Sequence, residues 1–241
     1  DKVKAFICTK DLKDEDYINN HFVIMVTKKG QVKKTSLEQY SRPRVNGINA
    51  ITIKEEDELL EAKLTDGNSQ VMLALKSGKA IRFEEAKTRP MGRNASGVRG
   101  IRLQHDKDEV IGMVSVNDME SNILVVSSNG YGKRSKLEDY RLTNRGGKGV
   151  KTISITEKTG DLVAIKNVDD SNGLMIINKS GIAIRMAVEN LRVMGRATQG
   201  VKLINLKDGD SIAAVAKVVH EDNQDEEVGQ IDEIEQNNQT E

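Results

Sequence analysis

Tryptophan is absent from this sequence, and aromatic residues make up only 3% of its 241 positions. The absence of Trp excludes the Trp-Asp signature of the commonest propeller repeat. The scarcity of aromatic rings argues against a site for single-stranded nucleic acid, in which bases stack on such rings. A core made from this composition has to rely on Ile, Val, Leu and Met.

Cysteine and histidine are nearly absent as well. The single cysteine, Cys8, has no partner for an internal disulfide, and we expect it to be a small apolar residue within a strand. The three histidines, His21, His105 and His220, are far apart in the sequence, so neither a metal site nor a general base is predicted. We therefore expect no catalytic residue, no metal and no cofactor in this chain.

Long hydrophobic runs are missing, and so is positive charge at one end. No segment approaches the roughly 18 apolar residues that a membrane-spanning helix requires, so we expect no membrane partner and a cytoplasmic location. Residues 219–241 contain nine of the 37 acids and no Lys or Arg, which leaves 28 acids against 37 bases in residues 1–218. A body of charge +9 with a tail of charge −9 is typical of a nucleic-acid-binding domain and a mobile competitor. The tail has too few apolar residues to fold, and we expect it to be disordered.

What the sequence does have is glycine in a regular register. Four short apolar runs each end in a turn whose glycine is Gly30, Gly78, Gly130 or Gly181, at spacings of 48, 52 and 51 residues. A second series follows 17 or 19 residues later, and each member opens a stretch of alternating polar and apolar residues: Gly47, Gly97, Gly149 and Gly200. Short strands separated by glycine turns at this period predict an all-β, propeller-like array with about four strands per repeat.

The repeats divide the chain into units of one domain. We place four complete repeats at about 21–68, 69–120, 121–171 and 172–218. Residues 1–20 align loosely with the stretch that begins at Asp108, so we interpret them as the end of a truncated preceding blade and the chain as a fragment of a longer protein. A repeat array buries its core between neighbouring units.

Cations recur in the same register. The fourth residue after each turn glycine is Lys34, Arg82, Arg134 or Arg185. Four residues before the second glycine stand Arg93, Arg145 and Arg196, and two residues after it stand Arg99, Lys151 and Lys202. Because sheets arranged in a ring place equivalent residues on one edge, we expect these cations to form a continuous rim that neutralises phosphates. Nothing resembles a recognition helix, so the expected ligand is duplex DNA that is held by its backbone and bent.

The chain resembles the C-terminal domains of the A subunits of bacterial DNA gyrase, a type IIA topoisomerase. The resemblance covers residues 1–218 and rests on three motifs: Asn129-Gly130-Tyr131-Gly132-Lys133-Arg134, the segment from Tyr140 to Gly149, and Met91-Gly92-Arg93 with Gly97-Val98. It implies a β-pinwheel, which is a propeller-like ring whose neighbouring blades exchange strands.

The resemblance also implies a function. The family wraps duplex DNA around its basic rim and presents a DNA segment for ATP-dependent strand passage and negative supercoiling. The implied partners are the rest of the A subunit, together with the ATPase B subunit, in an A2B2 assembly. ATP and magnesium are bound in that holoenzyme, at the nucleoid of the bacterial cytoplasm. The residues to which we assign DNA contact are Lys33, Lys34, Arg42, Arg44, Arg82, Arg93, Arg99, Lys133, Arg134, Asn144, Arg145, Gly146, Gly147, Lys148, Gly149, Lys151, Arg185, Arg196 and Lys202.

The sequence departs from the family in two respects. It shows four complete repeats where the family has six blades, and Thr143 and Asn144 stand where the family's Gln-Arg-Arg-Gly-Gly-Lys-Gly box begins with Gln and Arg. We expect the leading blades and the intact box to lie upstream. Two alternatives stay open: the matching domain of topoisomerase IV, and a protein-interaction propeller that binds a partner on its flat face with weak salt dependence.

Overall fold

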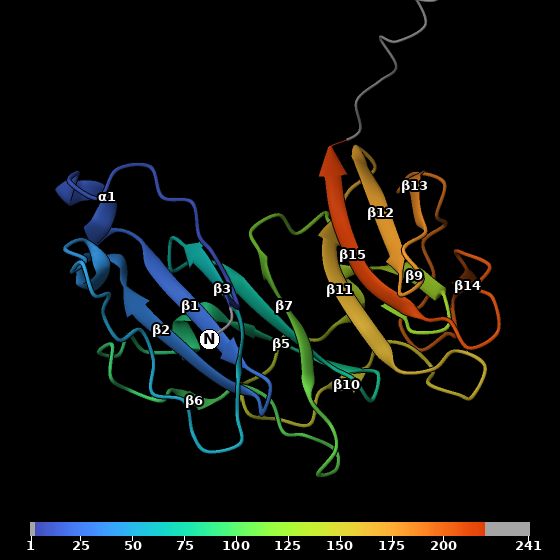
Figure 1. The fold of residues 1–241 in the computed structure, drawn as a ribbon, viewed down its shortest axis with the longest axis horizontal. Helices are drawn as coiled ribbons and strands as arrows, with labels where there is room; N and C mark the ends of the chain where they lie inside the picture. Colours follow the sequence, from blue (N-terminus) through green and yellow to red (C-terminus); the bar gives the residue numbers. More distant parts are fainter. Residues whose placement is uncertain (1–2, 220–241) are drawn as a thin grey trace, which may run out of the picture.

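The computed structural model describes residues 3–219, which form four antiparallel sheets that follow one another along the chain (Figure 1). One short helix, α1 (Glu15–Asn19), precedes the first sheet. Three 3₁₀ turns follow the first three hairpins: η1 (Leu37–Tyr40), η2 (Glu85–Lys87) and η3 (Leu137–Asp139). The prediction of an all-β, propeller-like array is confirmed.

Each sheet is built around a hairpin at a turn glycine. The hairpins are β1 (Phe22–Thr27) with β2 (Gln31–Ser36), β4 (Gln70–Leu75) with β5 (Lys79–Glu84), β8 (Asn122–Ser127) with β9 (Tyr131–Lys136), and β12 (Asn172–Asn178) with β13 (Ala183–Ala187). Gly30 closes the first turn at φ +81°, a conformation that costs glycine little, and its N–H donates to the Thr27 carbonyl at 3.0 Å.

The inner strand of each sheet comes from the end of the same repeat. These strands are β3 (Leu59–Thr65), β7 (Val110–Val116), β11 (Leu162–Val168) and β15 (Ile212–Val219), and each pairs with the first strand of its hairpin. Successive inner strands contact one another, β3 with β7, β7 with β11 and β11 with β15. The opposite, outer edge of each sheet is therefore formed by the second strand of the hairpin and whatever pairs with it.

The outer strands confirm strand exchange. Three two-residue strands, β6 (Val98–Arg99), β10 (Val150–Lys151) and β14 (Val201–Lys202), pair with the hairpin of the preceding repeat, at β2, β5 and β9 respectively. Each of the first three sheets therefore has four strands, one of them borrowed, and the fourth sheet has three within the described residues.

The second glycine of each repeat allows this exchange. A Cβ added to Gly149 would lie 2.6 Å from the carbonyl oxygen of Ala80 in β5, and one added to Gly97 would lie 2.6 Å from that of Val32 in β2. Both glycines also have positive φ, so a side chain is disfavoured twice over. Gly47 has no preceding blade in this chain, and a Cβ there would meet nothing within 4 Å.

The apolar core lies between blades. One buried cluster joins Ile24 and Val32 of the first blade to Leu73 and Ile81 of the second, and similar clusters join the second blade to the third and the third to the fourth. Packing between neighbours, instead of a single central core, is the mode of stabilisation that a repeat array requires.

Three expectations concern the two ends of the chain. Cys8 is exposed and lies outside any strand, so its prediction as a small apolar strand residue is wrong. Residues 3–14 form no strand, although Lys4 makes an ion pair of 2.6 Å with Glu58; their interpretation as the end of a preceding blade stays a prediction. The acidic tail lies outside the described residues, except for Val219 at the end of β15.

Candidate nucleic-acid interface

The cations at the fourth position after the turn glycine are largely buried in the first three blades. Lys34 is 4% exposed, Arg134 is 7% exposed, and Arg82 is half-buried. The expectation that these side chains present charge on an open rim is therefore corrected. We call Lys34, Arg82 and Arg134 the anchor residues, because each reaches from its own blade into the next.

The first two anchor residues bind the 3₁₀ turn of the following blade. Lys34 Nζ lies 3.5 Å from Oε1 of Glu85, which is itself fully buried. Arg82 Nη1 donates hydrogen bonds of 2.9 and 3.0 Å to the carbonyl oxygens of Leu137 and Tyr140. A buried cation that lost these acceptors would be left uncompensated, so the contacts hold adjacent blades in one orientation.

The third anchor residue, Arg134, binds carbonyl oxygens of the following blade as Arg82 does, and it also binds a carboxylate. Arg134 donates to the carbonyl oxygens of Leu191 and Glu189 in the fourth repeat, and it forms an ion pair with Asp170. Arg185, at the same position of the fourth blade, is exposed.

The backbone of each anchor residue fixes the start of a basic loop. We use basic loops for residues 89–97, 141–149 and 192–200. The loop N–H groups of Met91, Thr143 and Met194 donate to the carbonyl oxygens of Lys34, Arg82 and Arg134, at 2.8, 2.9 and 2.8 Å. Each loop then returns to the same strand two residues closer to its turn, where the exchanged strand begins. The basic loop of one blade is thus clamped at both ends on the outer edge of the blade before it.

Lys33 and Lys133 donate hydrogen bonds to carbonyl oxygens of the basic loops. Both side chains are buried. Lys33 Nζ donates to the carbonyl oxygens of Ala50, at 2.5 Å, and Arg93, and Lys133 Nζ donates to that of Gly195 at 2.5 Å. Burial is the main cause that lowers the pKa of each lysine to about 8. The charge of Arg93 also lowers the pKa of Lys33, whereas Asp139 opposes the lowering at Lys133 and Arg196 adds to it. These two lysines therefore position loops, and the expectation that they face DNA is corrected.

Arginines inside the loops bind backbone as well. Arg145 donates from Nε to the Lys87 carbonyl at 2.9 Å and from Nη1 to the Arg99 carbonyl at 3.1 Å. Arg196 Nη1 donates to the Lys151 carbonyl at 2.8 Å. Arg145 and Arg196 are half-buried, so their guanidinium groups tie the loops of the third and fourth blades to the preceding exchanged strand and keep part of their surface in solvent. Arg93 is half-buried as well.

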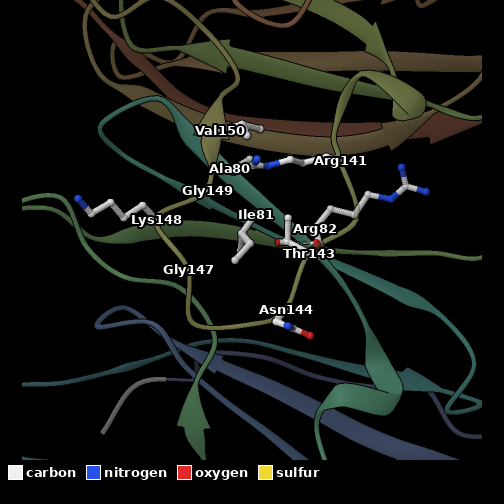
Figure 2. Close-up of a pocket in the computed structure, with 10 residues that line it drawn as sticks. All are labelled: Ala80, Ile81, Arg82, Arg141, Thr143, Asn144, Gly147, Lys148, Gly149 and Val150. Atoms are coloured by element: carbon white, nitrogen blue, oxygen red, sulfur yellow. Dashed lines mark hydrogen bonds between the residues drawn. The ribbon is translucent and has the colours of Figure 1, made fainter.

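The remaining predicted residues lie at the surface. Exposed positions on the loops and exchanged strands are Arg42, Arg44, Arg99, Asn144, Gly147, Lys148, Lys151 and Lys202, whereas Gly146 and Gly149 are half-buried. Figure 2 shows the loop of the third blade crossing β5, with the side chains of Lys148 and Asn144 directed away from Ile81. DNA contact at these positions stays a prediction.

A further arginine series was not predicted from the sequence. The eleventh residue after the turn glycine is Arg89, Arg141 or Arg192 in the second, third and fourth repeats, and all three are exposed. Arg141 lines the same hollow over β5 as Asn144 and Lys148 (Figure 2). The register count that found the other cations would have found this series too, but Ser41 interrupts it in the first repeat.

Within the part of the chain that the structure describes, we looked for a metal site and for a membrane-spanning helix. Residues 3–219 contain no group of three or more His, Cys, Asp or Glu side chains placed to hold a metal ion. Within the same range, no helix has the length and apolar character needed to cross a bilayer. Tyr140 is buried, and its hydroxyl contacts Thr152 Oγ1 at 2.5 Å.

Fold and surface together define the class: a strand-exchanged, propeller-like array whose outer loops and outer strands carry cations in register. A family model described as DNA gyrase C-terminal domain, beta-propeller, matches residues 21–66, 71–117, 121–169 and 174–218. The chain belongs to this family.

Curated relatives carry the gyrase name as well. The chain is 43% identical over 221 residues to the DNA gyrase A subunit of Staphylococcus epidermidis (strain ATCC 12228 / FDA PCI 1200), and 44% identical over 225 residues to that of Staphylococcus aureus (strain NCTC 8325 / PS 47). These matches cover 91% and 93% of this chain but 24% and 25% of the relatives, so the chain spans about a quarter of their length. The resemblance seen in the sequence is confirmed.

Solved structures support the fold. The C-terminal domain of DNA topoisomerase IV has a TM-score of 0.78 at 24% identity, covering 83% of this chain and 62% of that one. The DNA gyrase A C-terminal domain has a TM-score of 0.75 at 23% identity, covering 83% and 67%. At such identities the likeness shows the architecture alone, and the sequence relatives described above bear the gyrase name.

Proposed function

We propose that this chain binds duplex DNA without sequence specificity along the outer edges of its blades, and bends it. One observation carries the proposal. At three successive blade junctions, the same contacts clamp a basic loop and an exchanged strand onto the preceding blade. Exposed cations therefore recur on equivalent outer strands, at Arg99, Lys151 and Lys202. A strand of phosphates is the ligand that such a repeated, sequence-independent charge fits.

The energetics favour backbone binding. Bending a 20–30 base-pair site by 40–90° costs on the order of 1–6 kcal/mol, so several phosphate contacts have to act together. A rigid series of loops keeps those contacts in place before DNA arrives, which lowers the ordering cost of binding.

We infer the wider role from the relatives' names. In a DNA gyrase, DNA bent on this domain would be presented for ATP-dependent strand passage and negative supercoiling. The rest of the A subunit, together with the ATPase B subunit in an A2B2 assembly, would be its partner, with ATP and magnesium bound there and not in this chain. The bacterial cytoplasm, at the nucleoid, would be its location.

The test is a salt titration of DNA binding. We expect the chain to bind a 40-base-pair duplex with an affinity that falls steeply with salt, by about 0.9 in log–log slope for each phosphate contact. The triple variant Arg99→Glu, Lys151→Glu, Lys202→Glu should lose most of that affinity. Its log–log salt slope should be smaller by about 2.7, which corresponds to three phosphate contacts. Fluorescence anisotropy between 50 and 300 mM KCl measures both, because the Debye length passes through about 10 Å within this range.

The control variant changes the same charge elsewhere. Lys63 and Lys217 lie on the inner strands β3 and β15, and Lys13 precedes α1. The triple variant Lys13→Glu, Lys63→Glu, Lys217→Glu should keep the slope of the wild-type chain. Equal losses in the two variants would show that net charge alone attracts DNA, and unchanged binding in the first would overturn the proposed surface. Ligation of relaxed circles with bound chain should trap a change in linking number if the DNA is bent into a wrap.

A further inference from the structure

Three blades present an exposed arginine followed by an exposed apolar residue at one repeat position. The pairs are Arg89-Pro90, Arg141-Leu142 and Arg192-Val193. Leu142 is 45% exposed and Val193 is 43% exposed, so both apolar side chains keep a large part of their surface in contact with solvent. Because the pairs stand eleven and twelve residues after successive turn glycines, they occupy equivalent places on successive blades.

The backbone under each pair is held rigidly. The apolar member forms a parallel β-bridge with the anchor residue of the preceding blade: Pro90 with Lys34, Leu142 with Arg82, and Val193 with Arg134. The next residue donates its N–H to the same anchor residue. Exposure of Leu142 and Val193 is thus built into the blade junction, since the junction fixes the direction of the chain at this point.

Polar and charged groups surround Leu142. Leu142 lines a hollow together with Glu84, Lys87 and Asn144. The only carboxylate among these, Glu84, lies 4.0 Å from Lys87 and is partly neutralised by it. Arg141 lines the adjoining hollow with Lys148 (Figure 2). An apolar side chain with Lys87 in its hollow and Arg141 in the adjoining one suits a ligand that carries regularly spaced negative charge with apolar surface between the charges.

A DNA strand has this chemistry, because each nucleotide joins an anionic phosphate to the hydrocarbon face of a deoxyribose. We propose that each pair holds one nucleotide of the duplex, with the guanidinium on the phosphate and the apolar side chain against the sugar. The anchor residues are then positioning residues for these pairs. This inference rests on the proposed function and deepens it, since it assigns DNA contact to Arg89, Arg141 and Arg192 and adds a contact that salt does not screen.

The experiment separates the two halves of the pair. The 241-residue chain is titrated with a 40-base-pair duplex across a series of KCl concentrations. Arg141→Gln with Arg192→Gln should weaken binding and reduce the log–log salt slope by about 1.8, which is two phosphate contacts. Leu142→Ala with Val193→Ala should weaken binding several-fold at every salt concentration and leave the slope unchanged. The conservative variant Leu142→Val with Val193→Leu should retain wild-type affinity.

Matched controls guard against unrelated losses. Phe6→Ala with Ile182→Ala removes two exposed apolar side chains elsewhere and should leave the affinity unchanged. If the alanine pair lowers the melting temperature, the volume-conserving variant Leu142→Asn with Val193→Thr replaces it and should give the same loss.

The outcomes distinguish the two proposals. Absence of duplex binding by the wild-type chain would sink the proposed function and this inference with it. The sugar contact alone would be overturned if the wild-type chain binds normally and two variants keep full affinity: Leu142→Ala with Val193→Ala, and Leu142→Asn with Val193→Thr. An unchanged slope in the arginine variant would overturn the phosphate contact. Tight binding of a Glu-rich apolar peptide that displaces DNA, with no slope change in the arginine variant, would assign the pairs to a protein partner instead.

Discussion

The third position after the turn glycine alternates between lysine and isoleucine along the chain, as Lys33, Ile81, Lys133 and Ile184. Where lysine stands, its ammonium group donates to loop carbonyls; where Ile81 stands, the loop packs on it through Gly147, whose added Cβ would lie 3.4 Å from the Ile81 Cδ1. The Gly-rich loop therefore packs on an isoleucine, whereas the two loops that contain Met-Gly-Arg are hydrogen-bonded to a lysine.

Protonation of Lys133 provides a prediction at this scale. Its pKa in the folded chain is about 8, against 10.5 when unfolded, so between these values the unfolded chain binds more protons. The free energy of unfolding should therefore rise with pH in this window, by roughly 1–2 kcal/mol from pH 7.5 to pH 9.5 for this group. Lys133→Met should lose that part of the rise. Urea unfolding at the two pH values measures it, and an identical pH dependence in both chains would contradict the assigned pKa.

At the scale of elements, the exchanged strands hold the array together. Each is only two residues long, and it pairs with a blade that it does not belong to. Such a strand cannot be stable by itself, so it depends on the clamped loop before it and on the glycine that lets it approach. This explains why the second glycine recurs even where the loop sequence changes.

Replacement of that glycine tests the close approach. Gly149 and Gly47 have similar positive φ, +70° and +74°, so alanine at either position adds a backbone cost of about 1–2 kcal/mol. Only Gly149→Ala also places a Cβ 2.6 Å from the Ala80 carbonyl oxygen. We expect Gly149→Ala to lower the free energy of unfolding by at least about 1 kcal/mol more than Gly47→Ala. Equal losses in urea unfolding would mean that the strand does not approach β5 this closely.

At the scale of the whole molecule, charge is separated along the chain. Residues 1–218 carry a net +9 and residues 219–241 a net −9. Because exposed cations recur on the outer strands and basic loops, an acidic tail attached after the fourth blade can compete with DNA for them.

The tail's effect on binding is therefore predictable. Removal of residues 220–241 should raise the affinity for duplex DNA several-fold at 50 mM salt, and the gain should shrink as salt screens the charges. A tail of equal length with every Asp and Glu changed to Asn and Gln is the control and should behave like the truncation. If that neutral tail still weakens binding as the native tail does, the competition is not electrostatic.

Much of the architecture follows from local sequence. A hairpin needs only two apolar runs and a glycine between them, so Gly30, Gly78, Gly130 and Gly181 determine where the sheets lie along the chain. Strand exchange could not be derived from residues such as Val150 and Lys151, because two residues carry no periodicity and their partner belongs to another repeat. It was expected only from the resemblance to the gyrase family.

The repeated cations show what spacing leaves undecided. Arg134 and Lys151 recur with equal regularity, yet Arg134 is buried in a blade junction and Lys151 is exposed on an outer strand. The sequence by itself determined the register and sign of every charge. Only the tertiary structure decided which charges face solvent, because that depends on where the next blade packs, and a period along the chain contains no information about a contact made from outside it.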